Sequence, residues 1–152
     1  VVSTQEISDL IKEIQHKINY EACDYVMSMA VLQSTNCKAS IEETLSSAFE
    51  KEITITNLQP ATNLQISDAM EFALTFADHS PAPYMGTREH RQDVRLIKQM
   101  FSSLLYRNTG IYKFDIPYCS GDGHPFYPIF WDFSYCIRYR DSVIIFVASA
   151  SD

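Results

Sequence analysis

Apolar residues recur with the spacing of an α-helix over much of the first hundred positions. Ser3 and Glu6 stand three positions apart, a spacing typical of a capping box at the start of a helix. The apolar positions that follow form one helical face, with Ile7, Leu10, Ile11, Ile14 and Ile18. Because the same period continues to Met29, we expect one long helix, or two abutting helices, over 4–34.

Three further helices are predicted in the same way. Ser40 has a glutamate three positions later and precedes a helix expected over 41–51. Ser67 is a suitable cap for a third helix, whose alanine and phenylalanine side chains share one face. Thr87 is a suitable cap for a fourth helix over 87–107, which has a long apolar stripe.

The apolar period changes from helical to alternating near the C-terminus, which is typical of strands. Alternation predicts a strand over 111–116 and a hairpin over 130–148. The return half of that hairpin is apolar on both faces, so it should lie in the middle of a sheet. Earlier in the chain, the alternating segment 53–56 indicates either a short strand or a frayed helix end, and Pro60 indicates a loop.

Length and element order predict a single domain over 1–152 with an α+β fold. About four N-terminal helices should pack on a small C-terminal antiparallel sheet, made of the hairpin 130–148 and the strand 111–116. No apolar run approaches the roughly 18 residues that a membrane span needs. The four cysteines contain no CxxC pair, so we expect free thiols in a soluble, cytoplasmic protein.

The formal net charge of −7 lies entirely in the first half of the chain. Residues 1–76 hold eleven acidic and four basic side chains, and residues 77–152 hold eight of each. A surface of one sign favours a partner of the opposite sign, so this half predicts binding to a basic protein. The candidate partner-binding residues are Asp9, Glu13, Glu42, Glu43, Glu50, Asp68 and Glu71. The alternative is that these carboxylates are ordinary solvated helix faces.

A turn-rich segment between two prolines, 117–128, offers an alternative as a small cysteine-dependent enzyme. It contains Cys119, Asp122 and His124, and a thiol nucleophile needs a base such as histidine to form the thiolate. The same residues with Cys136 are suitable metal ligands in type. However, no pair has the close spacing that fixes two ligands on one element, so we predict no metal and no cofactor.

The predicted fourth helix carries the chain's only basic stripe. Its members follow one another in steps of three, four and three, as Arg88, Arg91, Arg95 and Lys98. Such a stripe favours contact with phosphate or RNA, which gives the alternative of a nucleic-acid-associated protein. Glu89 and Asp93 are interleaved with it, and the chain as a whole is acidic, so a solvated face or a face that docks on the acidic helices is also open.

The C-terminal hairpin resembles the closing hairpin of some bacterial immunity proteins, which accompany contact-dependent inhibition and other polymorphic toxins. The resemblance lies in the strand Trp131-Asp132-Phe133-Ser134-Tyr135, the apolar return strand 143–148 and the end Ser149-Ala150-Ser151-Asp152. It implies a cytoplasmic, non-enzymatic protein that binds and blocks a cognate toxin domain. Such toxins are often basic nucleases, which agrees with the acidic first half. The resemblance supplies no site residues.

Overall fold

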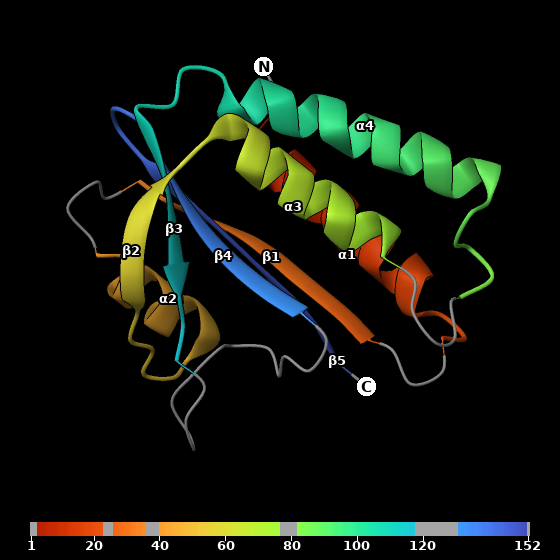
Figure 1. The fold of residues 1–152 in the computed structure, drawn as a ribbon, viewed down its shortest axis with the longest axis horizontal. Helices are drawn as coiled ribbons and strands as arrows, with labels where there is room; N and C mark the ends of the chain where they lie inside the picture. Colours follow the sequence, from red (N-terminus) through yellow and green to blue (C-terminus); the bar gives the residue numbers. More distant parts are fainter. Residues whose placement is uncertain (1–2, 23–25, 36–39, 77–81, 118–130, 152) are drawn as a thin grey trace.

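Helices and strands are interspersed along the chain in the computed structural model, which describes residues 3–22, 26–35, 40–76, 82–117 and 131–151 (Figure 1). In chain order the elements are α1 (Thr4–Asn19), β1 (Val26–Ser34), α2 (Ile41–Phe49), β2 (Thr56–Ala61), α3 (Asn63–Thr75), α4 (Arg88–Leu105), β3 (Gly110–Asp115), β4 (Trp131–Arg138) and β5 (Val143–Ser151). None of the helices in these ranges is both long enough and apolar enough to cross a lipid bilayer.

The strands form one antiparallel sheet of five, in the order β1-β5-β4-β3-β2. β5 is an interior strand between β1 and β4, and its residues from Val143 to Ala150 are all buried. Its apolar side chains therefore contribute to cores on both faces, as expected for a strand without a polar side. β2 is an edge strand with mostly exposed residues, which is where Pro60 can lie without breaking the ladder of hydrogen bonds.

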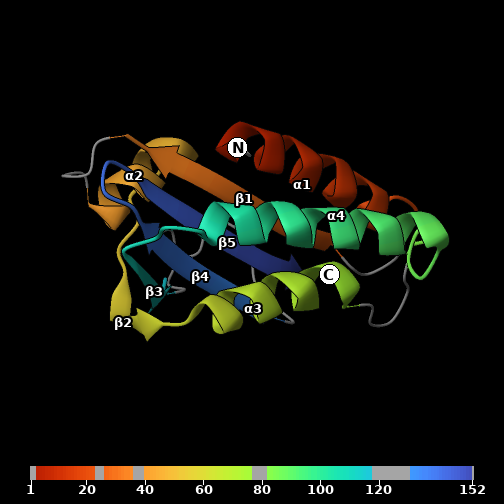
Figure 2. The ribbon, with the colours of Figure 1, turned by 90° about the horizontal axis from the view of Figure 1, so that it is seen from above.

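Helices cover the two faces of the sheet unequally (Figure 2). α1, α3 and α4 pack on one face, around a core that includes Ile11, Ile97, Phe101 and Phe146. α2 packs on the other face, over a smaller core that includes Leu45 and residues of β3, β4 and β5. The acidic helix α2 therefore lies on the side of the sheet opposite to α4.

The predicted arrangement of N-terminal helices on a small C-terminal sheet is wrong. The helices and the antiparallel sheet are consistent with an α+β protein, but the two kinds of element are interspersed along the chain. The strand expected over 111–116 and the hairpin expected over 130–148 supply only three of the five strands. The other two strands, β1 and β2, come from the first half of the chain. They complete the sheet by pairing with β5 and β3, which lie far away in the sequence.

The long helix predicted over 4–34 is also wrong, since it ends at Asn19 and is followed by a strand. Tyr20 caps the helix in an extended conformation, and Glu21, with a φ of 57°, then turns the chain away from the helical path. In β1 the buried residues alternate with partly buried ones, as Met27, Met29 and Val31. Val26 and Met29 fitted the helical period by coincidence. The segment forms a strand because it pairs with β5.

The third helix begins earlier than predicted, and the segment 53–56 is not the strand. Thr62, not Ser67, caps α3, and the side chain of Gln65 accepts a hydrogen bond from the backbone of Thr62 in return. Ile53 is buried under α2 before β2 begins at Thr56. The expected loop at Pro60 is part of β2.

Side chains of α1 bond to the outer edge of β1. The amide of Asn19 donates to Met27 O and accepts from Met27 N, both at 2.8 Å. One turn earlier, Gln15 Oε1 accepts from Met29 N at 3.1 Å. These contacts satisfy backbone groups that an edge strand otherwise leaves open to pairing with another chain.

Candidate functional site

The carboxylates of α4 are bound by a lysine of α1. Lys17 Nζ lies 2.7 Å from Glu89 Oε1, 3.0 Å from Asp93 Oδ2 and 3.5 Å from Glu13 Oε1. The hydroxyl of Tyr84 also donates to Asp93 Oδ2, at 2.9 Å. These interactions tie α4 to α1 on one side of the helix.

The electrostatics of this cluster follow from its composition. The hydrogen bond with Glu89 and the charge of Asp93 outweigh partial burial and raise the pKa of Lys17 above its usual range. Burial, and then the hydrogen bond and charge of Asp93, raise the pKa of Tyr84. Lys17 therefore stays charged and Tyr84 neutral, so Glu89 and Asp93 are held on the α1 side of α4 and do not offset the basic stripe.

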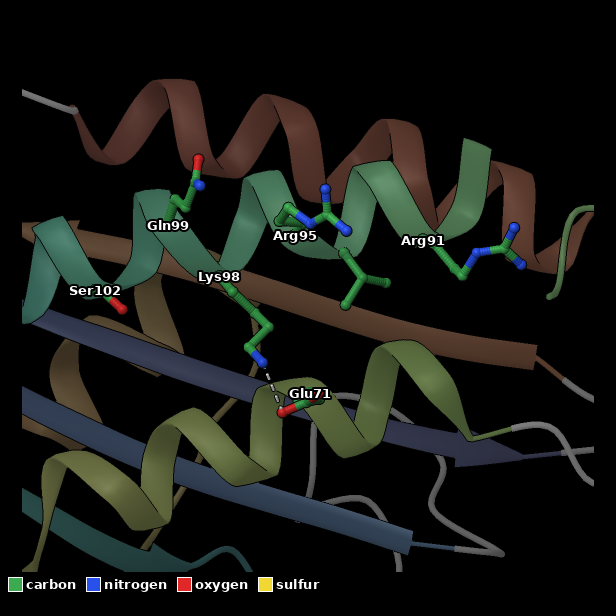
Figure 3. Close-up of a pocket in the computed structure, with 7 residues that line it drawn as sticks. Glu71, Arg91, Arg95, Lys98, Gln99 and Ser102 are labelled. Carbon is green, nitrogen blue, oxygen red and sulfur yellow. Dashed lines mark ion pairs between the residues drawn. The ribbon is translucent and has the colours of Figure 1, made fainter. Parts of the chain in front are cut away.

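The other side of α4 faces α3 across a groove of about 570 Å³ (Figure 3). Three cationic side chains line it, together with two uncharged polar residues, one valine and one glutamate from α3: Arg91, Arg95, Lys98, Gln99, Ser102, Val94 and Glu71. The groove thus combines three positive charges with donors that can bind an anion and with an apolar patch.

The three cations differ in the partners they already have. Lys98 Nζ lies 3.1 Å from Glu71 Oε2, and both side chains are nearly half exposed. Arg91 donates to the backbone oxygen of Gly86 at 2.7 Å. Arg95 is exposed and has no ion-pair partner among the residues that the structure describes. Its guanidinium is therefore free to bind an anion from outside.

A buried histidine fixes α3 and α4 relative to each other. His90 Nδ1 lies 3.0 Å from the backbone nitrogen of Gly86, and Nε2 lies 2.8 Å from Leu74 O. An N–H must donate to the first ring nitrogen and a carbonyl can only accept from the second, so the ring is neutral with its proton on Nε2. Because Leu74 is in the last turn of α3, this bond sets the spacing of the two groove walls.

The predicted acidic surface is divided by the sheet. Glu42, Glu43 and Glu50 belong to α2 or its end, on the opposite side from the other four residues. Of those four, Glu13 is bound to Lys17, Glu71 is bound to Lys98, and Asp9 accepts from the side chain of Gln5 at 2.8 Å. Asp68 is exposed on α3. The seven carboxylates therefore do not form a single surface.

The cysteine-dependent alternative falls on residues outside the described ranges, since Cys119, Asp122 and His124 all lie there. Cys136 is described and is completely buried in β4. Burial raises the pKa of its thiol to about 11, which keeps it protonated at neutral pH. In the ranges given above, no group of three or more His, Cys, Asp or Glu side chains is placed to hold a metal ion.

Three of the four cations predicted as a basic stripe line the groove, whereas Arg88 lines a separate pocket beside Lys17 of α1. Two neighbours of the stripe were not interpretable from the sequence. Glu89 and Asp93 seemed to neutralise it, and the structure shows them on the other side of α4 with Lys17. Glu71 was predicted to belong to an acidic surface, and in the structure its side chain lines the basic groove. No sequence signal joins Glu71 to Lys98, because the pair depends on how α3 and α4 pack.

Comparison with known proteins finds a likeness of fold. The chain has the fold seen in citrus MAF1. One crystal structure of citrus MAF1 superposes with a TM-score of 0.55 at 14% identity, over 95% of this chain and 98% of that one. A second crystal form gives a TM-score of 0.52 at 13% identity, with the same coverage. No protein-family model matches the chain, and no curated protein sequence matches it. At this identity, the likeness to MAF1 concerns the path of the backbone and assigns no function.

Proposed function

We propose that this protein is a non-enzymatic binding module, which binds an acidic segment of a partner protein in the groove between α3 and α4. The single observation that supports this is the placement of Arg91, Arg95 and Lys98 along one groove, while the carboxylates of α4 are bound by Lys17 on its other side. Arginine suits this task, because its planar guanidinium can bind a carboxylate with two parallel hydrogen bonds.

The spacing of the cations matches a helical ligand. With a rise of about 1.5 Å per residue, Arg91 and Arg95 are displaced along α4 by roughly 6 Å, and Lys98 lies about 4.5 Å further on. Carboxylates at positions i and i+4 of a partner helix have the same displacement as Arg91 and Arg95, the two cations of the groove that have no carboxylate partner among the described residues. The net charge of −7 opposes an acidic ligand at long range. At physiological salt, charges further apart than about 8 Å are largely screened, so the groove dominates once the ligand is near.

A labelled helical peptide with pairs of glutamates four residues apart, hereafter the glutamate-pair peptide, tests this function. Arg95→Ala should weaken binding about three- to tenfold, because a charge-assisted hydrogen bond contributes roughly 1.5–3 kcal/mol when well made and less when exposed. Lys12→Ala is the matched control, since it removes the same charge from an exposed position of α1. Fluorescence anisotropy gives the affinities. Equal losses in the two variants would show that net charge, and not the groove, governs binding.

The inhibition of a basic toxin domain is a second proposal, for which we choose the acidic side chains of α2 as the binding surface. Glu42 and Glu50 are presented there on the face opposite to the basic groove, whereas Glu43 is engaged in the capping box with Ser40. The probe is a purified basic toxin domain. Replacing Glu42 and Glu50 by lysine should slow its association, and added salt should slow its association with the wild-type protein. Unchanged rates in both experiments would exclude this surface. A cytoplasmic location forms part of this proposal.

A further inference from the structure

We infer that Glu71 determines which class of anion the basic groove accepts, favouring an acidic protein segment over single-stranded nucleic acid. The inference rests on the proposed function of the groove and adds a residue that selects the ligand. It concerns the nucleic-acid alternative directly, because the same basic stripe would carry both activities.

Lys98 extends from α4 toward α3, where it meets the carboxylate of Glu71 (Figure 3). The distance between Glu71 Oε2 and Lys98 Nζ is 3.1 Å, and the two side chains are 44% and 45% exposed. The carboxylate of Glu71 therefore lies where a ligand anion would meet Lys98. Because both groups remain in contact with solvent, an incoming ligand meets this pair directly.

The pair divides the groove into two parts. Arg91 and Arg95 present positive charge toward one end, while Lys98 is compensated by Glu71. The uncharged residues Gln99 and Ser102 also line the groove, and the Gln99 side chain points away from the pair (Figure 3). The groove as a whole carries three positive charges and one negative charge, and the negative charge has a fixed position.

The two ligand classes meet this pattern differently. Nucleic acid carries one phosphate on every nucleotide, so a strand that follows the whole stripe must place a phosphate beside Glu71. A protein segment can place carboxylates opposite Arg91 and Arg95 and an uncharged residue opposite Glu71. Like charges in contact reduce affinity, and specificity in such sites commonly depends on a repulsive element of this kind.

Glu71→Gln removes the repulsive charge and keeps the size of the side chain. Asp68→Asn is the matched control, because it removes one exposed carboxylate from the same helix without touching the groove lining. The probes are single-stranded oligouridylate and the glutamate-pair peptide, each measured over a series of salt concentrations. Circular dichroism checks that both variants fold, and an exposed ion pair contributes too little to fold stability to prevent this.

Glu71→Gln should strengthen binding of oligouridylate about two- to fivefold, the range expected for one exposed charge pair. The plot of log affinity against log salt should also steepen by about 0.7, the value for one additional phosphate contact on a single strand. The affinity for the glutamate-pair peptide should change less than this. Adding Lys98→Ala to Glu71→Gln should remove the gain, because Lys98 makes the new contact.

The outcomes separate the two proposals. If Arg95→Ala weakens binding of the peptide but Glu71→Gln changes neither the affinity nor the salt slope for oligouridylate, the role of Glu71 is wrong and the groove function stands. If Asp68→Asn gives the same gain as Glu71→Gln, the effect is one of net charge and the inference is wrong. If the wild-type protein binds oligouridylate more tightly than the peptide, the groove is a nucleic-acid site and both proposals are overturned.

Discussion

Replacing Asn19 by alanine should destabilise the protein through the edge of its sheet. Asn19 makes two hydrogen bonds of 2.8 Å to the backbone of Met27 in β1, one as donor and one as acceptor. Alanine removes both and leaves the N–H and C=O of Met27 without those partners. Since Asn19 is the last residue of α1 and alanine is the better helix former, helix propensity would act in the opposite direction.

The magnitude follows from the two groups that lose their partners. A buried backbone group without a hydrogen bond costs about 1–3 kcal/mol, and the Met27 side chain is completely buried. Two such groups would cost about 2–6 kcal/mol if water were fully excluded. Because water can reach part of an edge strand, we expect the free energy of unfolding to fall by roughly 2–4 kcal/mol, the lower part of that range. For a chain of this size this corresponds to a fall of roughly 4–16 °C in Tm.

Urea denaturation, combined with hydrogen exchange of backbone amides, measures this prediction. The amide of Met27 should lose protection in Asn19→Ala, whereas that of Met29, which donates to Gln15, should lose less. Gln5→Ala is the control, because the side chain of Gln5 donates to the exposed Asp9 on the same helix and, within the described part of the chain, to no strand. If Asn19→Ala changes stability by less than about 0.5 kcal/mol, the range of ordinary surface substitutions, the amide bonds do not hold the edge.

Two further predictions concern buried side chains. Burial raises the pKa of Cys136 to about 11, so iodoacetamide at neutral pH should alkylate this thiol only after the protein unfolds. Mass spectrometry measures the modification, and rapid alkylation of the native protein would contradict the burial of Cys136. Burial raises the pKa of Tyr139 to about 12, so its neutral form is stabilised and the free energy of unfolding should fall between pH 10 and pH 12. In the variant Tyr139→Phe, the free energy of unfolding measured by urea titration should fall less steeply with pH over that interval.

Local patterns in the sequence were sufficient for part of the fold. The apolar stripe after Thr87 predicted α4, and alternation predicted the hairpin of β4 and β5. These two predictions succeeded because a helix cap and a hydrophobic period both depend on residues that are close together in the sequence. The prediction for 26–34 failed because its apolar positions satisfy two periods, and only pairing with β5 distinguishes them.

The candidate site was predictable in composition but not in arrangement. The spacing predicted four cations on one side of a helix, and three of them, Arg91, Arg95 and Lys98, line the groove while Arg88 does not. Which charges would oppose them could not be inferred, because Lys17 and Asp93 meet across 76 positions of the chain. Glu71 was assigned to an acidic surface for the same reason, since its contact with Lys98 exists only when α3 and α4 pack together.

The amino-acid sequence by itself determined where most helices and strands form and which side chains share a helical face, because those properties depend on spacing along the chain. The tertiary structure alone decided that β1 and β2 complete the sheet, that α2 lies opposite α4, and that Asp93 meets Lys17 while Glu71 meets Lys98. Attraction between charges depends on their distance in space, which packing sets.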